Sequence, residues 1–121
     1  MNPTRMLAAA GMAALVTGIV AAGAVAAPKG GTLVASVSDP LNISLTQGGK
    51  KVTSLKAGAY TITVQDKASD HDFHLTGPGV NKVTSVSGKG TTTWKVTLKK
   101  GTYKYVCDPH KAFMKGSFTV S

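Results

Sequence analysis

Several absences limit what this chain can be. Its 121 residues include a single cysteine, Cys107, so no disulfide can form within the chain. Glutamate is absent and the only arginine is Arg5, which leaves no aromatic-and-arginine platform on which nucleic acid bases could stack. After residue 28, no segment shows the apolar period of an amphipathic helix. We therefore expect no strands joined in parallel by helices, and no nucleic acid partner.

The N-terminal segment has the pattern of an export signal. Arg5 supplies a positive charge, residues 6–25 form an uncharged apolar run, and Ala24-Val25-Ala26 has the small residues that a signal peptidase accepts. We predict that residues 1–27 are a cleaved signal peptide. The run is long for such a signal, so an uncleaved N-terminal anchor is the alternative. The domain that follows is expected to be exported, to the periplasm or to the extracellular face of the cell.

The remaining residues, 28–121, suffice for one small domain. They carry 13 lysines and five aspartates, which leaves a net charge of +8. A surface of this kind attracts acidic partners through long-range electrostatics that salt screens. We expect a monomer with no membrane span after signal cleavage, and partners with an acidic docking surface.

Period-two alternation of apolar and polar residues indicates β-strands through most of this domain. Clear alternation covers residues 32–38, 41–45, 60–65 and 93–98, and shorter strands are expected at 83–86, 103–107 and 116–120. Glycine, proline and lysine clusters separate these segments as turns. Roughly eight short strands with regular turns predict an all-β, Greek-key β-sandwich.

Three potential metal ligands lie within eight residues near the end of the sequence: Cys107, His110 and Met114. Pro109 cannot donate to a β-ladder, so the strand ends here and the chain must loop back toward Gly116. A thiolate, an imidazole and a thioether are donors that favour copper, and a second imidazole would complete the set of a blue-copper centre.

The second imidazole is expected from the segment His71-Asp72-Phe73-His74-Leu75. If His71 begins a strand in which Phe73 and Leu75 face inward, His74 faces outward. This parity favours His71 over His74 as the ligand, with His74 as the alternative.

The spacing Cys107-x-x-His110-x-x-x-Met114, after an aromatic-rich strand and with His71 upstream, resembles the cupredoxins, the small type 1 blue-copper proteins. The Cys-x-Pro-His core is similar to that of plastocyanin, amicyanin and pseudoazurin. The resemblance implies one copper ion bound by the thiolate of Cys107, the imidazoles of His71 and His110, and a weak axial Met114. It also implies a Greek-key sandwich over residues 28–121 that transfers single electrons between larger redox proteins.

Two features depart from that family pattern. Three residues separate His110 from Met114, whereas amicyanin-like loops have two and plastocyanin-like loops four. The family usually has asparagine after the upstream histidine, tied to the residue after the cysteine; here these positions are Asp72 and Asp108. Two neighbouring carboxyl groups do not ionise independently, so one is expected to titrate at raised pH or to turn toward a lysine, and the reduction potential to depend on pH.

These patterns predict an exported electron carrier, not an enzyme. The electron is expected to leave through His110, amid apolar Ala112, Phe113 and Pro78. The main alternative is a copper-binding module that buffers or delivers copper at the cell envelope without carrying electrons. A metal-free adhesion module is a further alternative. A cysteine hydrolase would need a group that stabilises an oxyanion, and none is evident in the sequence. Structural zinc sites prefer more than one thiolate, so neither function is expected here.

Overall fold

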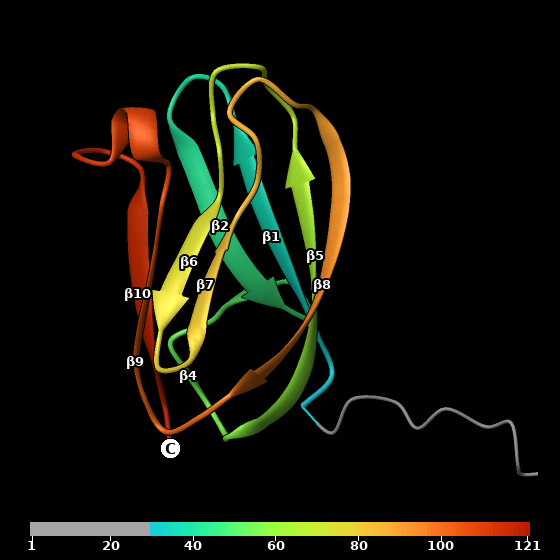
Figure 1. The fold of residues 1–121 in the computed structure, drawn as a ribbon, viewed down its shortest axis with the longest axis vertical. Helices are drawn as coiled ribbons and strands as arrows, with labels where there is room; N and C mark the ends of the chain where they lie inside the picture. Colours follow the sequence, from blue (N-terminus) through green and yellow to red (C-terminus); the bar gives the residue numbers. More distant parts are fainter. Residues whose placement is uncertain (1–29) are drawn as a thin grey trace, which may run out of the picture.

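The computed structural model describes residues 30–121, which form two five-stranded sheets packed face to face (Figure 1). The predicted signal peptide lies outside these residues. The first sheet has the order β3 (Lys50–Lys51), β2 (Asn42–Gln47), β1 (Thr32–Ser38), β5 (Gly58–Asp66) and β8 (Gly90–Leu98). The second has the order β4 (Ser54–Leu55), β10 (Lys115–Val120), β9 (Gly101–Val106), β6 (His74–Gly77) and β7 (Val80–Val83). The all-β sandwich predicted from alternation is confirmed.

The strand pairing includes two parallel pairs, β1 with β5 and β10 with β4. No α-helix of the described chain connects either pair, so neither is a helical crossover of the kind the sequence argued against. In a two-sheet sandwich the chain can cross from one sheet to the other and return in parallel, so helical crossovers are not required. Within residues 30–121, no helix is long and apolar enough to cross a membrane.

Alternation along the strands supplies the core between the sheets. Tyr60, Ile62 and Val64 of β5 are buried, as are Trp94 and Leu98 of β8. A fully buried aliphatic or aromatic side chain contributes about 1.5–3 kcal/mol relative to an exposed one. Burial of this alternating set therefore drives the two sheets together.

Two tyrosines of the core each cover a glycine on a neighbouring strand. Tyr105 lies opposite Gly116 in the β9–β10 register, and a Cβ atom added at Gly116 would overlap its ring. A Cβ atom added at Gly77, the last residue of β6, would likewise overlap the ring of Tyr103. These glycines are needed because the rings occupy the space of a side chain.

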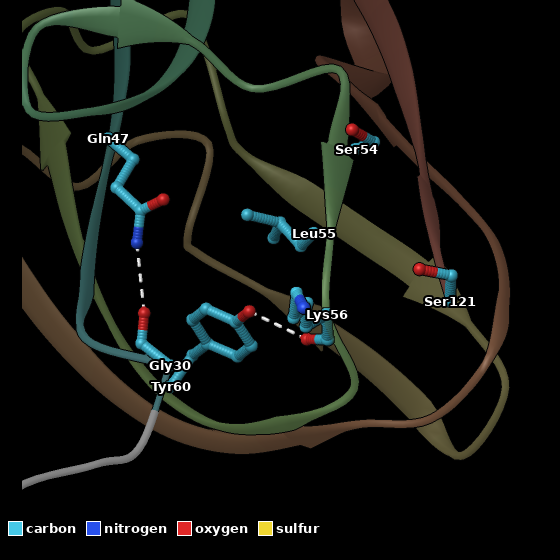
Figure 2. Close-up of a pocket in the computed structure, with 7 residues that line it drawn as sticks. All are labelled: Gly30, Gln47, Ser54, Leu55, Lys56, Tyr60 and Ser121. Atoms are coloured by element: carbon cyan, nitrogen blue, oxygen red, sulfur yellow. Dashed lines mark hydrogen bonds between the residues drawn. The ribbon is translucent and has the colours of Figure 1, made fainter.

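The two ends of the sandwich are different. Strands β1, β5 and β9 finish at one end, where the short 3₁₀ turn η2 (Asp108–His110) lies; we call this the η2 end (Figure 1). The opposite end has a groove of about 480 Å³ lined by Gly30, Gln47, Tyr60 and Ser121, among others (Figure 2). There the Tyr60 hydroxyl donates to the carbonyl of Lys56 at 2.6 Å and Gln47 Nε2 donates to that of Gly30 at 2.9 Å.

Candidate metal centre

The segment from Cys107 to Met114 forms a closed loop at the η2 end. Cys107 follows the last residue of β9, and Pro109 within η2 prevents further ladder pairing. The N–H of Cys107 donates to the Met114 carbonyl at 3.0 Å, and the N–H of Met114 donates to the His110 carbonyl at 2.8 Å. The backbone therefore fixes the loop, as the expected return of the chain near Gly116 requires.

His71 approaches this loop from the segment that precedes β6. Its side chain is buried, with the Nδ1 atom 3.6 Å from Cys107 Sγ. The strand begins at His74 and not at His71, so strict alternation starts later than expected. The parity nevertheless holds where the strand exists: Phe73 and Leu75 are buried, and His74 is partly exposed. The structure thus brings His71, and not His74, to the cysteine.

Three donor atoms converge at this point. His71 Nδ1 and His110 Nδ1 are 3.2 Å apart, and Cys107 Sγ is 3.5 Å from His110 Nδ1. An ion central to this triangle would lie about 2 Å from each atom, which is close to typical metal–nitrogen and metal–sulfur bond lengths in proteins. The donors therefore fit a small, thiophilic metal ion such as copper.

The triangle of donor atoms is shielded from solvent on one side only. Cys107 and Met114 are buried, whereas His110 is partly exposed. Burial raises the pKa of the Cys107 thiol, opposed by the N–H of Asp72, which points at the sulfur from 3.5 Å. A metal ion must displace the thiol proton when it binds, because only the thiolate is a ligand.

Asp72 and Asp108 link the two ligand segments. The backbone N–H of Asp108 donates to Asp72 Oδ1 at 2.6 Å, which is the tie expected of the family's asparagine. Asp72 is 2% exposed, and burial, together with the neighbouring Asp108 side chain, raises its pKa to about 6.

Of the two expected outcomes for this pair, the structure supports a carboxyl with a raised pKa, that of Asp72, and Asp108 turns toward a histidine. Its Oδ2 is 2.9 Å from His74 Nδ1, and His74 Nε2 donates to Asn81 Oδ1 at 2.7 Å. The side chain of Asp72 and then His74 hold the pKa of Asp108 below its ordinary value. Partial burial lowers the pKa of His74, but the bonds to Asn81 and Asp108 outweigh it and leave this pKa raised.

One residue predicted at the site surface is wrong, and one contact of the site was not predicted. Pro78 does not belong to the surface around His110: its carbonyl accepts from the Tyr103 hydroxyl at 3.2 Å, at the end opposite η2. Asp39, which the sequence showed only as a break between two strands, lies against His71 with Oδ1 3.0 Å from Nε2. This contact joins residues that are 32 positions apart, so no local pattern could have predicted it.

Comparison with known proteins agrees with this geometry. A family profile described as copper binding proteins of the plastocyanin/azurin family matches residues 32–121, most of the chain. The chain belongs to this cupredoxin family. The expected resemblance is confirmed, and the cofactor is copper.

Individual cupredoxins show how far the similarity extends. Amicyanin-alpha from Methylorubrum extorquens is 38% identical over 71 residues, which cover 54% of this chain and 57% of that protein. The match thus spans little more than half of that relative. The structure of reduced rusticyanin has a TM-score of 0.55 and 22% identity, over 76% of this chain and 80% of that one. Rusticyanin from Thiobacillus ferrooxidans has a TM-score of 0.54 and 24% identity, over 76% and 78%. At this identity the rusticyanins show the shared fold.

Proposed function

We propose that this cupredoxin is an exported type 1 copper protein that carries single electrons between redox partners. The observation that carries the proposal is the triangle of His71 Nδ1, His110 Nδ1 and Cys107 Sγ, with sides of 3.2 to 3.6 Å. A centre already arranged in this way needs little movement between two oxidation states, which is what a rapid electron carrier requires.

The chain's own residues would divide the work at the centre. His71, Cys107 and His110 would hold copper through two imidazoles and a thiolate, and buried Met114, at the end of the same loop, would supply a weaker thioether ligand. When bound, copper supplies a one-electron couple between Cu(I) and Cu(II). The backbone bonds within the loop hold the ligand positions, and burial of Cys107 keeps water from the sulfur.

The exposed surface around His110 is the proposed point of electron exit. His110 is the only partly exposed member of the four proposed ligands, and neighbouring Phe113 is 75% exposed. Ala112 is also exposed. A small apolar surface beside a redox ligand suits brief and weak docking, because a partner can dehydrate it without forming a large interface.

Charge is distributed unevenly around this surface. The five aspartates of the chain all lie near the η2 end, including Asp39 and Asp70 beside His71. Lysines dominate elsewhere, and no lysine of the described chain lies within ion-pair distance of a carboxylate. We propose that the net positive charge attracts acidic partners from a distance, and that apolar contact at Phe113 decides the final docking. The electron-transfer rate should then fall as salt is added.

We also propose that the protein is exported and is a monomer. The pattern of residues 1–27 supports a signal peptide, and a periplasmic or cell-surface location would follow from its cleavage. N-terminal sequencing of the protein recovered outside the cytoplasm tests this: a start at or near Pro28 supports cleavage. A start upstream of residue 6 would show that the apolar segment stays attached as an anchor.

The visible spectrum of the Cu(II)-loaded protein, beside Cys107→Ser, is the first experiment. An intense blue band that the variant lacks, and that a reductant bleaches reversibly, supports the type 1 centre. Electron self-exchange measured by NMR line broadening then separates carrier from buffer. Rapid exchange supports the carrier. A pale complex, or a blue one that exchanges electrons slowly and releases copper readily, would favour the copper-buffering or delivery function instead.

A further inference from the structure

The second ring nitrogen of His71 has a partner whose chemistry bears on the copper site. The ring is buried, and its Nδ1 atom points toward Cys107 and His110. Its Nε2 atom lies 3.0 Å from Oδ1 of Asp39, a residue whose side chain is 69% exposed. The imidazole therefore bridges from the proposed metal position to a carboxylate near the surface.

This contact selects one tautomer of His71. A carboxylate is an acceptor, so Nε2 must carry the hydrogen and donate it to Asp39. The lone pair of Nδ1 is then left free on the side that faces Cys107. A hydrogen-bonded carboxylate also pulls the Nε2 hydrogen more strongly than a neutral acceptor does, which makes the ring a stronger electron donor at Nδ1.

Asp39 is held in place independently of His71. It follows β1 in the first sheet, and its carbonyl accepts a hydrogen bond from Asn42 Nδ2 at 2.9 Å across the turn into β2. The Lys67 N–H donates to the nearby Val37 carbonyl at 3.0 Å, which fixes the end of β1 against the end of β5. Asp39 thus orients His71 from one sheet, whereas Cys107 and His110 follow β9 in the other.

Asp70 provides an internal comparison. It is similarly exposed, at 61% for the side chain, and it places a carboxylate oxygen near the same Nε2 atom. Its distance is 3.7 Å, which is beyond the range of a hydrogen bond. The two aspartates therefore contribute the same charge at nearly the same place, but only Asp39 makes the bond.

We propose that Asp39 is a positioning residue that fixes the Nε2–H tautomer of His71 and strengthens its bond to Cu(II) more than its bond to Cu(I). This inference rests on the proposed role of His71 as a ligand. Because Cu(II) is the more demanding acceptor of electron density, the carboxylate lowers the reduction potential of the centre.

The test compares Asp39→Asn, Asp39→Ala and Asp70→Asn with the wild type. In the metal-free protein, imidazole ¹⁵N chemical shifts report which nitrogen of His71 carries the hydrogen. We expect the Nε2–H form in the wild type, in Asp70→Asn and in Asp39→Asn, whose amide oxygen still accepts. We expect a mixture of tautomers in Asp39→Ala.

Copper affinities then measure the effect of the charge. Competition with chelators of Cu(II) and of Cu(I) should show Cu(II) binding weakened roughly 10- to 100-fold by Asp39→Asn, the range found for partners of metal-bound histidines. Cu(I) binding should change less. Each tenfold difference between the two raises the one-electron potential by about 59 mV. Asp70→Asn should leave the affinities and the potential close to those of the wild type.

Several results would overturn the proposal. Equal shifts in Asp39→Asn and Asp70→Asn would mean that charge alone acts, without the hydrogen bond. Equal weakening of both copper states, or an unchanged tautomer in Asp39→Ala, would contradict the assigned role. If the wild-type protein lacks the blue band, the proposed function fails; if the band is present and only Asp39 has no effect, this inference alone fails.

Discussion

Replacement of Asp72 with asparagine should stabilise the metal-free protein at neutral pH. Asp72 is buried, and its pKa is raised from an ordinary value of 3.8 to about 6, first by loss of hydration and then by Asp108. At 1.36 kcal/mol per pKa unit, the cost of ionising it in the folded state is about 3 kcal/mol. Asparagine carries no charge and keeps an oxygen to accept the Asp108 N–H.

The stabilisation should depend on pH in a defined way. Because the folded-state pKa of Asp72 lies above its unfolded value, the cost is complete above about pH 6 and disappears as the pH falls toward 4. The Asp72→Asn protein should therefore exceed the wild type by up to about 3 kcal/mol at pH 7.5 and match it near pH 4. The raised pKa of His74 also favours the fold at low pH. Asn81 and Asp108 raise it more than Asp72 does, so most of this contribution persists in the variant.

Urea denaturation of the metal-free proteins at several pH values provides the assay. With a slope of about 1–3 kcal/mol per molar urea, the midpoint should rise by about 1–3 M at pH 7.5. Asp70→Asn is the matched control, because it removes an adjacent but exposed charge and should change little. A gap between Asp72→Asn and wild type that stays constant from pH 4 to 7.5, or a loss of stability in the variant, would refute the reasoning.

Three further predictions concern packing, a buried hydroxyl and the metal. Gly116→Ala should cost about 1–3 kcal/mol in thermal or urea unfolding, because the methyl group overlaps the Tyr105 ring, whereas Ser117→Ala on the exposed face should be nearly neutral. Tyr103→Phe should cost about 1–3 kcal/mol by removing a hydroxyl that bonds to backbone at 2.8 and 2.9 Å; Tyr105→Phe, whose hydroxyl bonds to no described residue, should cost little. Copper at a thousandfold excess over its dissociation constant should add about 4 kcal/mol to the stability by calorimetry, an increment that Cys107→Ser should largely lose.

Local patterns in the sequence were sufficient for the strands and for much of the site. Alternation placed Tyr60, Ile62 and Val64 in the core, and a cysteine, a histidine and a methionine on one short loop need no distant information to be found together. His71 was selected by the parity of Phe73 and Leu75, although the strand itself begins three residues later than predicted.

The errors concern relations between segments. Pro78 was placed near the site because alternation does not specify at which end of a sandwich a turn lies; the register of β6 with β9 decides that. The strand expected at 83–86 is observed at Val80–Val83. A tight turn after Gly77 pairs Gly77 with Val80, so the strand begins earlier than predicted. Asp39 was missed since its contact with His71 depends on how the two sheets pack.

The positions of Gly30, the first residue that the structure describes, and of Ser121 have a practical consequence for attaching this protein to other objects. Gly30 and Ser121 line the same groove (Figure 2), at the end of the sandwich opposite η2 (Figure 1). A tag, a linker or a fused domain joined at either residue would therefore leave the His110 surface unobstructed. A gold electrode linked through an added C-terminal thiol would hold every molecule in one orientation, with the centre pointing into solution. Electrons from the electrode would then have to cross the length of the sandwich, and those from a soluble mediator would not.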